Sequence, residues 1–221
     1  MTGNSFFILF YKMKIIIFGA QGAGKGTQAE NIAQYFKIPH LSTGNIFREN
    51  IKKGTELGKL AASLINEGKL VPDEITNKIV KQTISQNEYA KGFILDGYPR
   101  NISQAEFLDN VTDIDFVINL EVEKKELIRR ISSRRVCEKC GTNYNLIYVK
   151  PKNENFCDLC NGKLLQRDDD KENAVNKRLD IYYSQTKPLE KFYEKKGILF
   201  RIDGTPAIKE VFEKIKKVLE H

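Results

Sequence analysis

Residues 15–27 read IIIFGAQGAGKGT, four apolar residues followed by a glycine-rich loop that ends on lysine, glycine and threonine. The apolar run predicts a strand that is buried on both faces of a parallel sheet. Glycines after such a strand allow successive backbone N–H groups to surround an anion, and the N-terminus of the next helix adds a positive dipole. Lys25 supplies a mobile positive charge at the end of the loop. The segment therefore predicts a phosphate-binding loop, and a glycine-rich turn without a ligand is the alternative.

The loop departs in one place from the common pattern G-x-x-x-x-G-K-[ST]. The first seven positions fit, but Gly26 takes the place of the hydroxyl residue, which arrives one position later as Thr27. This variant is typical of nucleoside monophosphate kinases. Residues 24–28, GKGTQ, resemble adenylate kinases most closely, although Gln21 stands where that family usually has proline. The resemblance implies that ATP is bound by Gly22, Ala23, Gly24, Lys25, Gly26 and Thr27.

The chain has 221 residues and a formal net charge of +7, with 41% hydrophobic and 29% charged residues. This composition is ordinary for a soluble protein, and the length allows one domain or one domain with an insertion. A basic chain suits a phosphate-rich partner, either a nucleotide or a nucleic acid. Apolar runs are shorter than the roughly 18 residues that a membrane span needs, and residues 5–11 lack the features of a signal peptide. We therefore expect a cytoplasmic protein with no membrane partner.

Residues 1–12 form a leader that is unusually apolar for a tail, with FFILFY at residues 6–11. Met13 could be the natural start, in which case the leader is a misassigned or disordered extension. Alternatively, the leader adds a strand at a sheet edge or an oligomer contact, because exposed apolar segments favour burial. We expect a monomer unless the leader joins chains.

A second group of motifs resembles the acceptor site of adenylate kinases. Residues 42–48 read STGNIFR, and residues 70–73 read LVPD, like the segment that lines the AMP base in that family. Residues 92–100 read GFILDGYPR, a predicted buried strand that runs into a loop, and a glutamine follows four positions later. The resemblance implies that AMP is bound by Thr43, Arg48, Lys69, Leu70, Val71, Gly97, Arg100, Gln104, Arg167 and Arg178.

Three side chains near the second strand have chemistry that suits this site. Asp96 ends the strand at the edge where ligands bind in open α/β sheets, and its carboxylate could hold Mg²⁺ through water. The planar guanidinium of Arg100 matches a phosphate group. Gln104 carries a donor and an acceptor side by side and could read the adenine edge, although alone it would be interpreted as an exposed helix residue.

Arginines gather at the end of a predicted helix at 123–132. Four of them fall within positions 129–135, which is more than a helix C-terminus needs to balance its dipole. The resemblance assigns Asp169 and Asp170 to ion pairs that hold arginines at a hinge. It implies ATP contacts from Arg130, Arg134, Asn143, Tyr144 and Pro206, and a catalytic set of Lys25, Arg100, Arg130, Arg134, Arg167 and Arg178.

The four cysteines form two C-x-x-C pairs separated by 16 residues. This spacing is typical of a four-cysteine zinc site, and two disulfides or unrelated thiols are the alternatives. Four thiolates complete the tetrahedral coordination of Zn²⁺, so we expect a structural ion without a catalytic role. Glycines after each pair would free the backbone to turn, and Tyr144, Tyr148 and Phe156 would form the small core of this segment. The expected ligands are Cys137, Cys140, Cys157 and Cys160.

Alternating strand and helix patterns after residue 13 predict an α/β fold, a doubly wound parallel sheet with helices on both faces. We expect a P-loop kinase core at 13–133 and 168–221, which includes an AMP-binding helical segment at about 42–71. A small zinc-binding lid is expected as an insert at 134–167.

Hydrophobic spacing predicts the individual helices of this core. We expect helices at 28–36 and 54–68, one long helix at 171–195, and a closing helix near the C-terminus.

The resemblance to adenylate kinases with a zinc-bearing lid covers nearly the whole chain except the leader. It implies reversible, Mg²⁺-dependent phosphoryl transfer from ATP to AMP, with ADP as the product. A GTP:AMP kinase or a UMP/CMP kinase is an alternative, because base contacts in these enzymes are largely made by backbone groups. Asn101 follows the arginine as in uridylate-cytidylate kinases, but their short lid argues against them.

A nucleic-acid-binding protein with a zinc ribbon and a P-loop is a remote alternative. The net charge favours it, but the lysines and arginines are spread along the chain and no basic stretch is interleaved with aromatic residues. We therefore expect ATP, AMP and ADP as partners and no nucleic acid.

Overall fold

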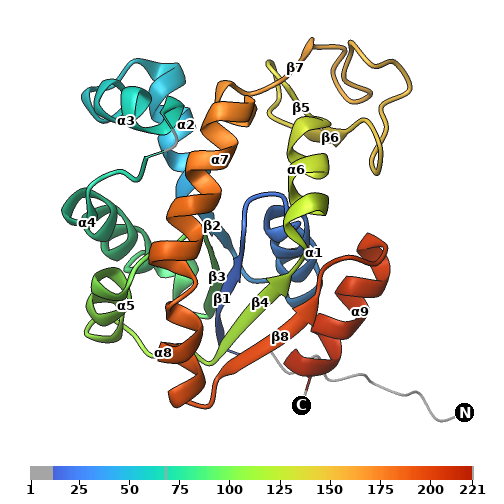
Figure 1. Ribbon diagram of the computed structural model, residues 1–221. Helices are drawn as coiled ribbons and strands as arrows, with labels where there is room; N and C mark the ends of the chain where they lie inside the picture. Colours follow the sequence, from blue (N-terminus) through green and yellow to red (C-terminus); the bar gives the residue numbers. More distant parts are fainter. Residues whose placement is uncertain (1–11, 68, 221) are drawn as a thin grey trace, which may run out of the picture.

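The computed structural model describes residues 12–67 and 69–220, so the strand or oligomer contact expected at residues 6–11 lies outside the described residues. A five-stranded sheet forms the centre of the molecule, with the strand order β2-β3-β1-β4-β8 (Figure 1). Every paired neighbour is parallel. The strands are β1 (Met13–Gly19), β2 (His40–Ser42), β3 (Gly92–Asp96), β4 (Phe116–Glu121) and β8 (Leu199–Asp203).

Side chains of β1 alternate between two hydrophobic clusters on opposite faces of the sheet. Ile15 and Ile17 belong to the first cluster, while Ile16 and Phe18 belong to the second. The first cluster includes residues of α1 (Lys25–Phe36), α6 (Lys124–Ser132), α7 (Glu172–Ile181) and α9 (Ile208–Leu219). The second includes residues of α4 (Asp73–Ile84), α5 (Ile102–Asp109) and α8 (Leu189–Lys195). The predicted doubly wound parallel sheet is therefore confirmed.

The carboxyl ends of the parallel strands meet at one edge of the sheet, where the chain leaves for its helices. α2 (Thr43–Lys53) and α3 (Glu56–Asn66) stand at this end on one side of α7. A small three-stranded sheet stands at the same end on the other side (Figure 1). Its antiparallel strands are β5 (Arg134–Cys137), β6 (Asn143–Asn145) and β7 (Leu164–Leu165).

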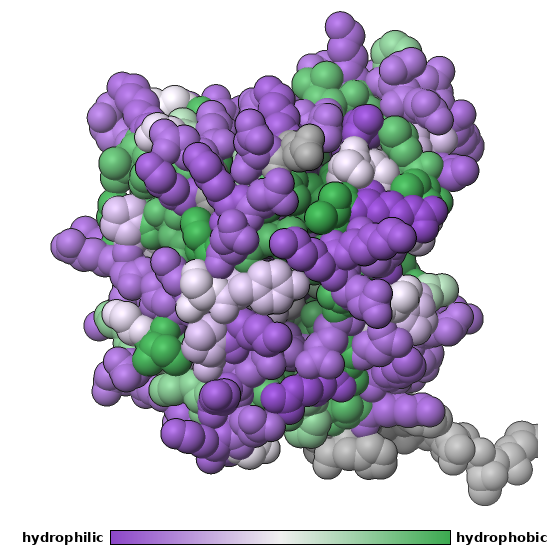
Figure 2. All heavy atoms as spheres, in the orientation of Figure 1, coloured by the Kyte–Doolittle hydropathy of each residue, from purple (hydrophilic) through white to green (hydrophobic). Residues whose placement is uncertain are grey.

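The surface shown in Figure 2 is mostly charged or polar, with apolar residues in smaller groups between them. Within residues 12–67 and 69–220, no helix is long and apolar enough to cross a membrane.

Two predicted helices differ from the observed ones at their ends. The helix expected at 28–36 begins at Lys25, directly within the glycine loop. The helix expected at 54–68 spans Glu56–Asn66, because the Thr55 hydroxyl caps its start by accepting a hydrogen bond from the Gly58 N–H at 3.0 Å.

The prediction of a single long helix at 171–195 is wrong. α7 ends at Ile181, a π-helical turn follows over Tyr182–Thr186, and α8 begins only at Leu189. The Lys187 N–H bonds to the Tyr182 carbonyl at 2.8 Å, an i to i+5 contact, and Pro188 has no N–H to continue the helix. Hydrophobic spacing did not reveal this break because both halves keep an apolar stripe.

The crossing of α2 and α3 depends on a glycine. A Cβ on Gly58 would lie 2.1 Å from the Asn50 carbonyl oxygen and 2.6 Å from the Ile51 nitrogen, so the two backbones touch. This contact brings Phe47 of α2 against Ala61 of α3 in a separate small cluster.

Replacing Gly58 with alanine should push α2 and α3 apart. We expect Gly58→Ala to lower the free energy of unfolding by about 1–3 kcal/mol, the usual cost of overpacking, as measured by chemical denaturation. Ser63→Ala is the matched control, because it places alanine at an exposed position of the same helix. A Gly58→Ala protein as stable as the wild type would contradict the close contact.

Candidate functional site

The phosphate-binding loop joins β1 to α1 in a conformation that requires glycine. Gly19 and Gly22 have φ values of 137° and 85°, which other residues rarely adopt. A Cβ on Gly22 would lie 2.8 Å from the Leu127 carbonyl oxygen, so the loop packs directly on α6. Lys25 Nζ reaches back and donates to the carbonyl oxygens of Gly19 and Ala20 at 2.7 and 3.0 Å. The loop thus holds its ammonium group at the carboxyl edge of the sheet.

Asp96 ends β3 beside this loop, paired in register with Ile17 of β1. Its Oδ2 atom lies 3.4 Å from His40 Nε2, and a Cβ on Gly26 would lie 3.7 Å from the same oxygen. Burial would raise the pKa of Asp96, but the contact with His40 and the charge of Lys25 outweigh it and hold that pKa below its ordinary value. An ionised carboxylate here fits the hydration shell of Mg²⁺. Sequence reasoning missed His40, because a histidine in a short strand carries no distinctive pattern.

Six basic side chains gather around the loop and lie close enough to shift one another's pKa values. They come from α1, α2, the loop after β3, β5 and the segment from β7 into α7. Three carboxylates lie among them, those of Asp96, Asp169 and Asp170, so the cluster has a formal excess of positive charge. The members of this cationic cluster are Lys25, Arg48, Arg100, Arg134, Arg167 and Arg178.

Two buried aspartates hold two of these arginines. Asp170, whose side chain is fully buried, binds Arg134 through both carboxylate oxygens, with Oδ2 2.7 Å from Arg134 Nε. Asp169 Oδ2 lies 2.8 Å from Arg178 Nη1, and the Asp169 carbonyl accepts a bond from the same nitrogen at 2.7 Å. The ion pairs expected at these aspartates are therefore present. The contact with Asp170 overcomes the effect of burial and raises the pKa of Arg134.

Among the residues that the structure describes, no carboxylate lies at such short range from the other members of the cluster. Burial lowers the pKa of Lys25 to about 8, and the charges of Arg100, Arg178 and Arg134 contribute to the shift. Burial and neighbouring arginines also lower the pKa of Arg100 to about 10 and that of Arg167 to about 9. Arg167 Nε is buried and finds no hydrogen-bond partner within the described part of the chain. Cations in this state are stabilised by an anion, so the cluster can bind phosphate groups.

A cavity opens beside the cluster, between α2, α3 and α7. Of the ten residues predicted to bind AMP, nine line this cavity, and Arg167 does not. Thr43 is buried there, and its hydroxyl donates to the Gly97 carbonyl at 2.9 Å. Seven further residues line the cavity without having been predicted to bind AMP: Gln21, Gly44, Phe47, Ile65, Thr76, Asp169 and Ile181. Gln21 was interpreted only as part of the glycine loop and Asp169 only as an ion-pair residue, and no motif singled out the others as AMP-binding.

Arg48 and Arg100 lie in the wall of this cavity. Arg48 Nη2 donates to Asn45 Oδ1 at 2.7 Å, and Arg100 Nε donates to the Gly97 carbonyl at 2.8 Å. The π-helical turn after α7 also reaches this region, because the Thr186 hydroxyl donates to the Arg100 carbonyl at 2.7 Å.

Gln104 lines the cavity from α5, but both ends of its carboxamide contact the protein. Oε1 accepts from the Arg100 backbone N–H at 2.8 Å, and Nε2 donates to Asp73 Oδ1 at 2.6 Å. The residue is 1% exposed, so the interpretation of a lone exposed helix residue is wrong. Sequence reasoning also missed Asp73 as its partner, since the two lie 31 residues apart in the chain.

Arg130 is not a member of the cationic cluster and contacts a different part of the protein. Its guanidinium donates to the carbonyl oxygens of Gly204 and Thr205 at 2.9 and 3.0 Å, and to Glu126 Oε1 at 2.8 Å. A Cβ on Gly204 would lie 3.2 Å from the Ala23 carbonyl oxygen, so the turn that contains Pro206 packs on the phosphate loop. The predicted ATP residues Arg130 and Pro206 therefore belong to one neighbourhood beside that loop.

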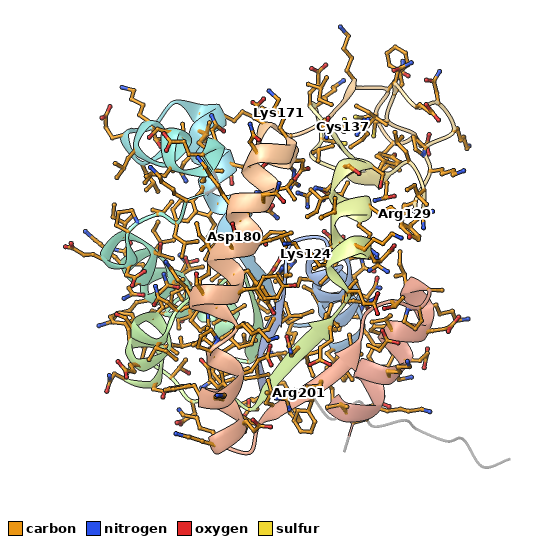
Figure 3. All side chains as sticks on the ribbon, viewed as in Figure 1. Lys124, Arg129, Cys137, Lys171, Asp180 and Arg201 are labelled. Carbon is orange, nitrogen blue, oxygen red and sulfur yellow. The ribbon has the colours of Figure 1, made fainter. Side chains whose placement is uncertain are left out.

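The four cysteines meet in the small sheet region, with their Sγ atoms all within 4.8 Å of one another. Cys137 Sγ lies 3.4 Å from Cys160 Sγ, and Cys140 Sγ lies 3.6 Å from Cys157 Sγ. All four are free thiols, so the disulfide alternative is not borne out. Tetrahedral Zn²⁺ with bonds of about 2.3 Å would place sulfurs about 3.8 Å apart, and the group fits that ion. Figure 3 places Cys137 beyond the end of α6, far from Arg201 in β8.

The core of this region differs from the prediction. Tyr144 is buried with Leu164 and the cysteines, but Tyr148 and Phe156 are 45% and 39% exposed. The Tyr148 ring instead lies under the guanidinium of Arg130, 5.2 Å from its centre. The prediction of a three-aromatic core was wrong because the cysteines occupy that place.

The two residues of this region that were predicted to bind ATP contact protein groups. The Tyr144 hydroxyl lies 3.5 Å from Cys157 Sγ and accepts a hydrogen bond from the Asp158 N–H at 2.9 Å. Asn143 Oδ1 accepts a bond from Arg167 Nη2 at 2.7 Å. Asn143 is thus brought to the cationic cluster, and Tyr144 to the cysteines.

Comparison with known proteins gives one family. Residues 17–198 match the model of the family described as adenylate kinase. Among curated relatives, an adenylate kinase of Thermoanaerobacter sp. (strain X514) is 51% identical over 212 residues, which cover 94% of this chain and 98% of the relative. One from Caldanaerobacter subterraneus subsp. tengcongensis is 52% identical, with 94% and 96% covered. One from Staphylococcus aureus (strain Mu50) is 50% identical over 214 residues, with 95% and 100% covered.

The lowered pKa of Lys25 has a consequence for stability. Between pH 8 and the ordinary lysine pKa, the folded protein binds fewer protons than the unfolded chain, so this group makes stability rise with pH over that window. Below pH 8 the buried charge is a penalty. We therefore expect Lys25→Met to raise the melting temperature at pH 7, by about 2–4 °C if the gain is about 1 kcal/mol.

The same measurement at higher pH tests the cause. The advantage of Lys25→Met should shrink between pH 8 and 10, because the wild-type lysine then loses its charge. Lys191→Met, at an exposed position of α8, should leave the melting temperature unchanged. A Lys25→Met protein that melts at or below the wild-type temperature at pH 7 would refute this account.

Proposed function

Because the chain belongs to the adenylate kinase family, we propose that it catalyses reversible, Mg²⁺-dependent transfer of a phosphoryl group from ATP to AMP, with two ADP as product. The observation that carries this proposal is the cationic cluster, which connects the phosphate loop with the cavity. Lys25 belongs to the loop, Arg100 and Arg178 line the cavity, and both arginines act on the pKa of Lys25. A donor phosphate in the loop and an acceptor phosphate in the cavity would share these charges.

The acceptor in this reaction is a phosphate that is already an anion at neutral pH, so no general base is needed. Catalysis then consists of alignment and of neutralising the charge on the phosphoryl group in transit. In our proposal Lys25, Arg130 and Arg134 serve the donor phosphates, with backbone N–H groups of residues 22–27. Arg48 and Arg100 hold the acceptor phosphate, and Arg167 and Arg178 stabilise the group between them.

Magnesium would supply positive charge that neutralises the donor phosphates when it is bound. Asp96 is the residue we assign to hold it through water. Its carboxylate is ionised and lies beside Gly26 of the loop, in contact with His40.

Water is the competing acceptor, and we propose that residues 134–167 close over the phosphates to exclude it. Arg134 and Arg167, at the two ends of this segment, belong to the cationic cluster, where Asp170 and Asn143 hold them. A closing movement would add their charges to the bound nucleotides, and reopening would then limit product release.

We assign the donor base to the surface between Arg130 and the turn at residues 204–206, where backbone carbonyls already meet the guanidinium. We assign the four cysteines to a structural Zn²⁺ ion. The close approach of Gly162, where a Cβ would lie 2.8 Å from Cys137 Sγ, supports a compact metal knuckle. The backbone of Asn161 adopts φ 55° beside it.

We further propose that the protein works in the cytoplasm as a monomer on free nucleotides, without a nucleic-acid partner. Four free thiols that converge on one point suit a reducing compartment.

The direct test is a coupled assay that combines four nucleoside triphosphate donors with four nucleoside monophosphate acceptors. We expect ATP with AMP to give the highest kcat/KM and to require Mg²⁺. Lys25→Met, measured in parallel, should lose at least about a thousandfold in kcat/KM. Highest activity with GTP, UMP or CMP would replace the assignment of substrates.

Arg100 should act on one substrate only. Truncating its guanidinium removes a bidentate partner of the acceptor phosphate, so Arg100→Ala should raise the KM for AMP at least about tenfold. The KM for ATP should stay within about twofold of the wild-type value on the same reasoning. Arg201→Ala is the control, because that arginine lies in β8, paired with glutamates at the surface. Equal increases in both constants would place Arg100 elsewhere.

Zinc should stabilise residues 134–167 and take no part in the chemistry. Metal analysis of freshly purified, reduced protein should give one ion per chain, and Cys157→Ala should remove it and lower the melting temperature. Part of the activity should survive at low temperature, since the other phosphate-binding residues lie outside this segment. Leu159→Ala, at a 76% exposed position of the same loop, is the control. Absence of bound metal would refute the assignment.

A further inference from the structure

The carboxamide of Gln104 is fixed by two partners, each of which has a single hydrogen-bonding role. Asp73 offers only acceptor oxygens as a carboxylate, and its Oδ1 lies 2.6 Å from Gln104 Nε2. The Arg100 backbone N–H can only donate, and it lies 2.8 Å from Gln104 Oε1. Rotating the carboxamide by half a turn would bring oxygen against carboxylate and NH₂ against N–H. The orientation of this amide therefore follows from chemistry.

The two contacts leave a defined pattern for the cavity that Gln104 lines. A carboxamide has two N–H donors and two lone pairs on oxygen, and one of each is used. Within residues 12–67 and 69–220, one donor on Nε2 and one acceptor site on Oε1 remain. Because Nε2 and Oε1 are fixed in place, a ligand base meets the donor and the acceptor in a fixed order.

We propose that Asp73 is a positioning residue that gives the acceptor site its choice of base, through Gln104. This inference rests on the proposed function, since it places the base of the acceptor nucleotide beside Gln104. The fixed amide matches a base that has an amino group next to an unprotonated ring nitrogen, as in adenine or cytosine. It opposes a base with an oxo group next to a ring N–H, as in hypoxanthine, guanine or uracil.

Asp73 acts through Gln104 because it does not itself line the cavity. Its carboxylate is braced by Asn101, whose Nδ2 lies 3.0 Å from both Asp73 oxygens. Asn101 Oδ1 also accepts a bond from the Gln104 N–H at 2.9 Å, which caps α5. Asp73 and Gln104 are thus held by the same side chain, although α4 and α5 are separate helices.

A mismatched base would leave buried polar groups unpaired. Such sites discriminate strongly, because an unpaired donor or acceptor costs more than the net value of a hydrogen bond. AMP and IMP differ only at the two positions that face the amide, so their ratio of kcat/KM measures this discrimination directly. Cytosine and adenine present the same hydrogen-bonding pattern to the amide and differ in size, so the amide does not discriminate between them.

The test replaces Asp73 with asparagine, which can donate or accept. The variant therefore removes the charged contact that opposes a reversed Gln104 amide, while the Arg100 N–H still opposes that orientation. We expect Asp73→Asn to lower the AMP:IMP ratio of kcat/KM at least about tenfold, chiefly by admitting IMP, with the KM for ATP within about twofold of wild type. The matched control is Glu74→Gln, which removes the same charge from the next position in the first turn of α4. The control should keep the wild-type ratio.

An unchanged ratio in folded Asp73→Asn protein would overturn the inference, and so would an equal fall in Glu74→Gln. Should Asp73→Asn fail to fold, Asp73→Ala carries the same expectation, because alanine suits a helix and removes the carboxylate that holds Gln104 Nε2. The wild-type assay separates the two claims. Wild-type turnover of AMP with an unchanged variant ratio refutes only the role of Asp73. Absence of turnover with AMP refutes the proposed function and this inference with it.

Discussion

Repulsion among like charges is the constraint on which the site depends. Six cations share one edge of the sheet, and a cluster of this kind would separate if it were left to itself. Asp169 and Asp170 prevent this by binding Arg178 and Arg134 from a short turn before α7. The remaining cations are held by packing, by backbone carbonyls and by asparagine side chains. Burial lowers the pKa values of Lys25 and Arg100 most, and the charges of neighbouring arginines lower them further. Buried cations in this cluster would attract phosphate more strongly than an exposed arginine, whose charge is screened by water.

Sequence reasoning was most successful where a motif is contiguous and its backbone is special. The glycine loop and the strand that ends in Asp96 each fix a local conformation, so their neighbours in space follow from the parallel topology. The two C-x-x-C pairs predict their own convergence through their spacing. It failed where contacts join distant segments through polar side chains. The sequence around Asp73 and Gln104 does not predict that the carboxylate in α4 orients the amide in α5. Similarly, the aromatic character of Tyr148 predicted a place in the small core, whereas its ring lies against the guanidinium of Arg130.

The small antiparallel sheet shows how few apolar residues can suffice when thiols converge. Its cluster contains two cysteines, Tyr144 and Leu164, with Cys160 packed against them. A segment with so little to bury would gain order from an ion held by the four sulfurs. The main sheet is stabilised by apolar burial instead, since two large hydrophobic clusters cover its two faces.

The π-helical turn at Tyr182–Thr186 has a geometric consequence. A π-turn adds one residue to a helix, and one residue in an α-helix corresponds to a rotation of about 100°. Val175 and Leu179, before the turn, face the first cluster, whereas Leu189 and Tyr193, after it, face the second. The turn changes the direction in which the apolar side chains point, so that α7 packs in the first cluster and α8 packs in the second. Loss of a single residue here would rotate α8 by about 100° relative to α7. Either Leu189 and Tyr193 would then leave the second cluster or Arg178 would turn away from the cationic cluster, so the length of this segment is as constrained as its composition.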